Sequence, residues 1–277
     1  THVIAIRGNF DDAQTGVKKI FADDEMKKKL AAEGIKLSSA NSINIGRLVP
    51  QVAYYVYSYV KLTEEGALKE GDPMNVVVPT GNFGNILAAY MAKEMGLPIG
   101  KLICASNENN VLTDFIRTGV YDARRQFYLT SSPSMDILIS SNLERLLYLL
   151  SGRDGKAVSD WMKALEADKV YEVSKKVREG LADFYGGFCT EREAREAIAA
   201  LWNEEGYLVD THTAVAYKVY RDYAEETGDE TPAVIASTAS AYKFAESVAD
   251  ACGLDVGKVK VLANSAAEPT GFDYVKA

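Results

Sequence analysis

Cysteine and histidine are scarce in this chain of 277 residues, which holds three cysteines and two histidines. The cysteines lie far apart, at Cys104, Cys189 and Cys252, without a C-x-x-C pair or a histidine cluster. We therefore expect neither a metal site nor a disulfide framework, and a reducing cytoplasmic location fits best. No apolar run approaches the roughly 20 residues that a membrane helix needs, and no signal-peptide pattern opens the chain.

Basic residues are outnumbered as well, with 31 Lys and Arg against 39 Asp and Glu and a net charge of −8. This balance argues against nucleic acid or an anionic membrane as a partner. It leaves room for an anionic small molecule, because backbone amides and one or two cations can hold a phosphate locally. Hydrophobic residues at 47% and charged residues at 25% are typical of a globular protein.

A glycine-bracketed loop separates an apolar run from a helix-forming stretch. The β-branched run 76–78 stops at Pro79, the segment Gly81-Asn82-Phe83-Gly84-Asn85 follows, and helical periodicity begins near Ile86. In such an arrangement the glycines permit close approach of the backbone, and the helix N-terminus aims unpaired N–H groups at an anion. The pattern predicts a phosphate cradle, although the spacing alone also fits an ordinary turn without a ligand.

Predicted strands alternate with predicted helices along the chain, which indicates an α/β fold with an open, mostly parallel sheet flanked by helices. The segment 63–73, rich in Glu, Gly and Lys, is interpreted as a boundary between a smaller domain over 1–62 and a larger domain over 63–277. The predicted strands are 3–6, 35–37, 75–78, 101–105, 233–236 and 259–262. The predicted helices are one capped by Asp11 or Asp12, then 45–60, 86–95, 111–118, 143–150, 213–226 and 240–251.

Two further polar loops follow predicted strands, where open α/β sheets place ligands. The segment 39–44 gathers hydroxyls and amides just before Arg47. It suits a carboxylate or phosphate, but helix capping by Ser42 or Asn44 is the stronger explanation from these residues alone. In the segment 237–240, the hydroxyls suit a ligand, and Ser240 also suits the cap of the following helix.

Five blocks of the sequence, in order, resemble threonine synthase. The most specific wording is PTGNFGN at 79–85, which resembles the loop that holds the phosphate of pyridoxal 5′-phosphate (PLP) in that family. The blocks cover 38–59, 76–112, 132–152, 210–216 and 237–248. The resemblance implies the PLP fold type II (tryptophan-synthase-β-like) and a cytoplasmic enzyme of threonine biosynthesis.

The resemblance also implies a set of site residues. It assigns the PLP phosphate to the loop, the pyridine nitrogen to the hydroxyl of Thr238, and the substrate side to a further group of polar residues. The loop residues are Gly81, Asn82, Phe83, Gly84 and Asn85, and the substrate-side residues are Asn41, Ser42, Arg47 and Asn142. His212 follows Thr211 where the family has proline, and we interpret it as a structural hydrogen-bonding residue. Ala241 also replaces a frequent proline.

The lysine that forms the Schiff base with PLP in this family lies in a block that would precede Thr1. The lysines at 18, 19, 27, 28, 29 and 36 match no such motif. We therefore interpret the chain as a C-terminal portion, incomplete at the N-terminus, that supplies no catalytic lysine and is inactive alone. The oligomeric state is left open by the sequence.

For the parent protein the resemblance implies a carbon–oxygen lyase acting on a phosphate ester. It would convert O-phospho-L-homoserine and water to L-threonine and phosphate, by γ-elimination followed by β-addition of water. The partner is then a small-molecule substrate. Two alternatives stay open: another fold-type-II PLP enzyme, such as a serine/threonine dehydratase relative, and a non-catalytic protein that binds a phosphate-bearing ligand.

Overall fold

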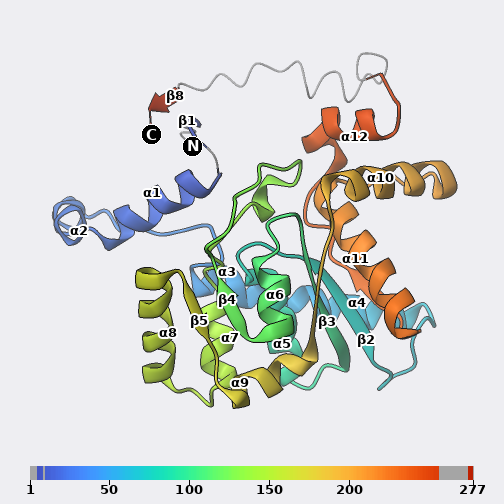
Figure 1. Ribbon diagram of the computed structural model, residues 1–277, viewed down its shortest axis with the longest axis horizontal. Coiled ribbons are helices and arrows are strands. Elements are labelled where there is room, and N and C mark those ends of the chain that lie inside the picture. The colour runs from blue at the N-terminus through green and yellow to red at the C-terminus, as the bar shows by residue number, and fades with distance from the viewer. Residues whose placement is uncertain (1–4, 9, 256–273, 277) are drawn as a thin grey trace.

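The computed structural model describes residues 5–8, 10–255 and 274–276. A four-stranded sheet lies at its centre, with helices on both sides (Figure 1). All the neighbouring strands in it are parallel. Their order is β6 (Phe184–Phe188), β3 (Ile99–Ser106), β2 (Met74–Pro79) and β7 (Ala233–Ile235). The predicted open, parallel α/β sheet is confirmed.

The two central strands carry β-branched and apolar residues on both faces, because both faces are covered. Along β2, Val76 and Val78 pack into one core with Phe115 of α6 (Val111–Thr118), while Val77 points to the other side. There it meets Val215 of α11 (Thr211–Thr227). Alternation along a single strand thus fills two cores, which fixes β2 in the middle of the molecule.

Helices make up most of the remainder. Before the central sheet come α1 (Phe10–Ala22), α2 (Asp24–Ala32), α3 (Ile45–Leu48) and α4 (Val52–Glu64). The later ones are α5 (Gly84–Glu94), α7 (Leu143–Leu150), α8 (Gly155–Asp168), α9 (Lys175–Gly180), α10 (Glu191–Glu205) and α12 (Ala245–Ala251). Short 3-10 turns are η1 (Val49–Gln51), η2 (Pro133–Met135), η3 (Leu181–Asp183) and η4 (Ala241–Phe244). None of the helices in the described ranges is long and apolar enough to cross a membrane.

Two small strand pairs lie outside the central sheet. The antiparallel pair consists of β4 (Val120–Asp122) and β5 (Val170–Glu172). The parallel pair consists of β1 (Ala5–Arg7) and β8 (Tyr274–Lys276), so segments from the first and last parts of the sequence lie side by side (Figure 1). The strand predicted at 259–262 lies outside the described residues.

Three local predictions are wrong. Residues 35–37 form no strand, because the Ile35 N–H instead bonds to the Leu30 carbonyl (2.9 Å) and closes α2. The first helix begins at Phe10, so Asp11 and Asp12 lie inside it and do not cap it. The helix predicted over 45–60 is interrupted, since Pro50 lacks an N–H and its ring collides with the preceding turn. The domain boundary after residue 62 stays a prediction.

Candidate functional site

The glycine loop leaves the carboxyl end of β2 and enters α5 at Gly84. Phe83, the residue before the helix, has a left-handed backbone (φ 62°), while its ring is buried in the core with 1% exposed. This turn starts α5 abruptly, and the N–H groups of its first turn have no partner inside the helix. A helix end of this kind, at the carboxyl edge of the sheet, suits an anion.

Close packing explains both glycines of the loop. A Cβ at position 81 would stand 2.4 Å from the Ser134 carbonyl oxygen, and a Cβ at position 84 would stand 2.3 Å from Ser42 Oγ. Both distances are far below van der Waals contact, so a side chain at either position would push a neighbouring segment away. The glycines therefore admit the segments 39–44 and 133–135 to the edge of the loop.

The segment 140–142 supports the loop from behind. Ser140 Oγ donates to the Gly81 carbonyl (2.8 Å), Ser141 Oγ donates to Asn82 Oδ1 (3.0 Å), and Asn142 Nδ2 donates to the Asn82 carbonyl (2.8 Å). These bonds fix the carbonyls of Gly81 and Asn82 and the side chain of Asn82.

A cavity of about 340 Å³ opens beside the loop and collects most of the residues predicted for the site. All five loop residues line it, as do the substrate-side residues Asn41 and Ser42, and Thr238. The remaining lining residues are Gln51, Val78, Pro79, Thr80, Ile86, Ser134, Met135 and His212. Segments far apart in the sequence thus meet at one cavity.

Two predicted substrate-side residues lie elsewhere. Arg47 is exposed on α3 and is not among the lining residues. Asn142 is buried behind the loop, where its amide also donates to Ser42 Oγ (3.0 Å). Arg145, which the sequence motifs did not single out, donates to the carbonyls of Ser42 (3.0 Å) and Ile43 (2.7 Å) and ties 41–44 to α7. The substrate-side roles of Arg47 and Asn142 stay predictions.

Asn85 and Thr238 lie where β7 and α4 approach the loop. Tyr55 of α4 donates its hydroxyl to Asn85 Oδ1, and burial raises the pKa of that phenol well above its usual range. Thr238 follows β7 and lines the cavity with an exposed side chain. The capping predicted for Ser240 is confirmed, because its Oγ accepts the Tyr242 N–H (3.4 Å). A neutral hydroxyl and an amide therefore flank the cavity on this side.

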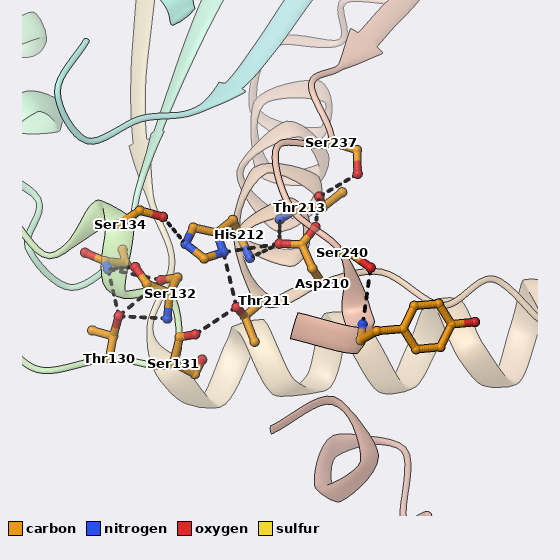
Figure 2. A network of polar contacts seen from close by, with 12 residues as sticks. Thr130, Ser131, Ser132, Ser134, Asp210, Thr211, His212, Thr213, Ser237 and Ser240 are labelled. Atoms are coloured by element: carbon orange, nitrogen blue, oxygen red, sulfur yellow. Dashed lines mark hydrogen bonds and ion pairs between the residues drawn. The ribbon is translucent and has the colours of Figure 1, made fainter. Parts of the chain in front are cut away.

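A buried carboxylate lies next to the cavity residue His212. It belongs to Asp210, the N-cap residue of α11. Its Oδ1 accepts the N–H of His212 (2.8 Å), and its Oδ2 accepts the Thr213 hydroxyl (2.5 Å). Burial raises the pKa of this carboxyl, but the hydrogen bonds from His212 and Thr213 outweigh burial and leave its pKa below the usual value. Figure 2 shows how this carboxylate holds His212, whose other ring nitrogen reaches Ser134.

His212 and Ser134 were not in the predicted set of site residues. Local sequence could not place them, because the contact joins positions 78 residues apart. The structural role predicted for His212 agrees with its contacts to Asp210, yet its ring also lines the cavity. The signal available beforehand was that His212 and Ser134 both lie in blocks that resemble threonine synthase.

A segment near the C-terminal end of the chain matches a family model. Residues 213–274 match the model described as "Threonine synthase, C-terminal". The human protein named "Threonine synthase-like 1" is 47% identical over 252 residues, covering 90% of this chain and 33% of the relative. Threonine synthase from Saccharomyces cerevisiae is 38% identical over 263 residues, covering 90% of this chain and 50% of the relative.

Solved structures agree with these sequence matches. PLP-bound threonine synthase from Brucella melitensis superposes with a TM-score of 0.83 at 37% identity, covering 100% of this chain and 57% of that one. The yeast threonine synthase structure gives a TM-score of 0.81 at 32% identity, with the same coverage. The predicted fold type II is therefore confirmed. The chain spans about a third to a half of the length of the curated relatives it matches.

Proposed function

This chain is related to the threonine synthases and carries a match to their C-terminal domain, and we propose on that basis that it forms the PLP-phosphate-binding part of such an enzyme. The proposed reaction converts O-phospho-L-homoserine and water to L-threonine and phosphate. The observation that carries the proposal is a single cavity in which the glycine loop and Thr238 meet.

The residues present fit PLP. The loop offers a backbone cradle that a Cβ at Gly81 or Gly84 would fill, and the N-terminus of α5 offers N–H donors for the phosphate. The hydroxyl of Thr238 suits a pyridine nitrogen that stays unprotonated, since a carboxylate in its place would stabilise the pyridinium form. Within the described residues, no carboxylate side chain lines the cavity.

When bound, PLP supplies an electron sink for cleaving bonds next to the substrate amino group. The residues of this chain then position the cofactor and the substrate. The loop and α5 hold the cofactor phosphate, and Thr238 orients the ring. Asn41 and Ser42 line the same cavity and are the proposed contacts of the substrate. Arg47 remains our candidate cation for the substrate phosphate.

A non-catalytic role is the second candidate. The relatives named "Threonine synthase-like 1" are 47% identical to this chain, whereas the relatives named threonine synthase are 36–38% identical. That difference supports a threonine-synthase-like protein that binds a phosphate-bearing ligand through the same loop. Turnover of O-phospho-L-homoserine by the whole protein would favour the enzyme. Activity on L-serine alone would instead favour a dehydratase-like relative.

The first test is a PLP titration of the full chain, followed by borohydride reduction and intact mass. We expect saturable binding without a stoichiometric covalent adduct, because the proposal places the anchoring lysine outside this chain. Gly81→Ala should abolish binding, since its Cβ would collide with the Ser134 carbonyl. Gly16→Ala is the matched control, because nothing lies within 4 Å of its Cβ. Absence of saturable binding would refute the proposal, and one modified lysine would mean that this chain carries the anchor.

The cytoplasmic location, the division into two domains and the absence of nucleic acid or membrane partners stay predictions. The location was predicted from the cysteines and the family resemblance, the division from the segment 63–73, and the absence of these partners from the net charge. The proposed small-molecule partner, O-phospho-L-homoserine, follows from the relation to the threonine synthases.

A further inference from the structure

Three residues form a continuous hydrogen-bonded row that ends at the cavity. Asp210 Oδ1 lies 3.2 Å from His212 Nδ1, and His212 Nε2 lies 2.5 Å from Ser134 Oγ. Asp210 and His212 come from the start of α11, whereas Ser134 comes from η2. Figure 2 shows the three side chains in this order, with the Ser134 hydroxyl at the far end from the carboxylate.

His212 is the ionisable side chain of the cavity. Among the lining residues in the described part of the chain, no other residue carries an acidic or basic side chain. Its ring is 2% exposed and packs against Phe244 of η4, at 4.9 Å between ring centres. Asp210 is the charged group that contacts it, and Lys243 lies beyond Phe244, 5.4 Å from the centre of that ring.

The carboxylate determines how this histidine can act. Because Asp210 accepts from the Nδ1 side, the Nδ1 proton stays there and Nε2 faces Ser134. A neutral His212 accepts the Ser134 hydroxyl proton at Nε2. A protonated His212 donates from Nε2 to Ser134 Oγ, which leaves the serine proton free to be donated into the cavity. Asp210 stabilises the charged form, so the row can store one proton.

Resting on the proposed function, we infer that Ser134 and His212 deliver the proton that the departing phosphate needs. The Cγ–O bond of O-phospho-L-homoserine breaks, and its electron pair stays on the oxygen that leaves with phosphorus. That oxygen takes the Ser134 hydroxyl proton while His212 Nε2–H restores the proton to Ser134. Without this transfer a phosphate-ester dianion would depart as a trianion. His212 regains its proton from the water that later adds to the substrate.

In this scheme Ser134 is a catalytic residue, His212 holds the proton and Asp210 is a positioning residue. A bound phosphate near the row favours the protonated form of His212, because opposite charges stabilise each other. The proton state of His212 should therefore respond to inorganic phosphate, the product of the reaction. The chain contains one other histidine, His2, so replacing it leaves a single histidine signal.

The test is 15N NMR of the ring nitrogens of His212 in the PLP-loaded His2→Gln chain, at constant pH, with and without inorganic phosphate. We expect phosphate to increase the share of His212 in the doubly protonated form. His212→Gln should weaken phosphate binding about tenfold or more, as expected for the loss of a charge-assisted hydrogen bond. Ser134→Ala, which alters an exposed side chain, should weaken the response of His212 while the fold is kept.

The outcomes separate the two proposals. If the chain fails to bind PLP, the proposed function fails before the row is tested. If PLP binds but phosphate leaves the His212 spectrum unchanged, or His212→Gln binds phosphate unchanged, the row is not a proton donor and the proposed function stands. A fluorophosphonate probe tests the alternative that Ser134 is a nucleophile, because hydrogen-bonded Ser, His and Asp side chains also form the catalytic triads of hydrolases. Covalent labelling of Ser134 would make it a nucleophile and overturn the proposal.

Discussion

Replacing Gly84 by alanine tests whether the segment 39–44 seats on the glycine loop as the structure has it. The new Cβ would stand 2.3 Å from Ser42 Oγ and 2.6 Å from Ser42 Cβ, so rotating the Ser42 side chain cannot relieve the contact. Overpacking of this kind costs about 1–3 kcal/mol. Alanine regains about 0.5–1 kcal/mol over glycine in a helix. We expect a net loss of about 1–2 kcal/mol together with weaker PLP binding.

The assay is urea unfolding of four chains, with PLP affinity as the second readout. They are wild type, Gly84→Ala, Ser42→Gly and the double variant. Ser42→Gly removes both atoms that the new Cβ would meet, so the double variant should recover most of the stability lost by Gly84→Ala. The coupling free energy from this cycle should be about 1–3 kcal/mol in the stabilising direction.

Gly155→Ala is the control for the helix effect alone. Gly155 is also the first residue of a helix, and nothing lies within 4 Å of the point where a Cβ would stand. It should be neutral or slightly stabilising. Equal stability of Gly84→Ala and Gly155→Ala, with no coupling to Ser42, would refute the close approach of the two segments.

Three further outcomes are expected. In the whole protein, Arg47→Ala should raise KM for O-phospho-L-homoserine without loss of PLP, and unchanged kinetics would remove Arg47 from the site. Asn142→Ala removes bonds to Ser42 and Asn82 and should cost about 1–3 kcal/mol in urea unfolding; a fully stable variant would contradict the support role. The lowered pKa of Asp210 means that its stabilisation is present above pH about 4 and is lost as the pH falls through its folded value. Asp210→Ala should therefore be less stable than wild type at pH 7, and the gap in urea midpoints should narrow at low pH.

Regular patterns made much of the fold predictable. The buried run that forms β2 and the periodic stretches that form α6 and α7 were predicted near their observed bounds. In each case the hydrophobic pattern and the residues that end the element indicated the same bounds. The prediction of a strand at 35–37 was wrong, because three residues are too few to indicate a partner strand. The Ile35 N–H instead closes the preceding helix.

Pairwise contacts over long distances in the sequence were beyond reach. The motif at 140–142 could be recognised, but not that Asn142 would face the back of the loop and not its front. The approach of Ser134 to His212 depends on where η2 and α11 come together in space. The loop itself was predictable because a strand, two glycines and a helix start are adjacent in sequence.

The left-handed Phe83 restricts how this loop can change over evolutionary time. Residues that adopt such a backbone easily, such as glycine and asparagine, lack the ring that packs 5.9 Å from the ring of Phe184. A residue with a large aromatic ring can make this contact, but it must adopt the strained left-handed backbone of Phe83. Few single substitutions satisfy both demands, so the position should vary little among relatives even where the ligand differs. Invariance at Phe83 would then record the folding requirement of the turn, and would be poor evidence about what the cavity binds.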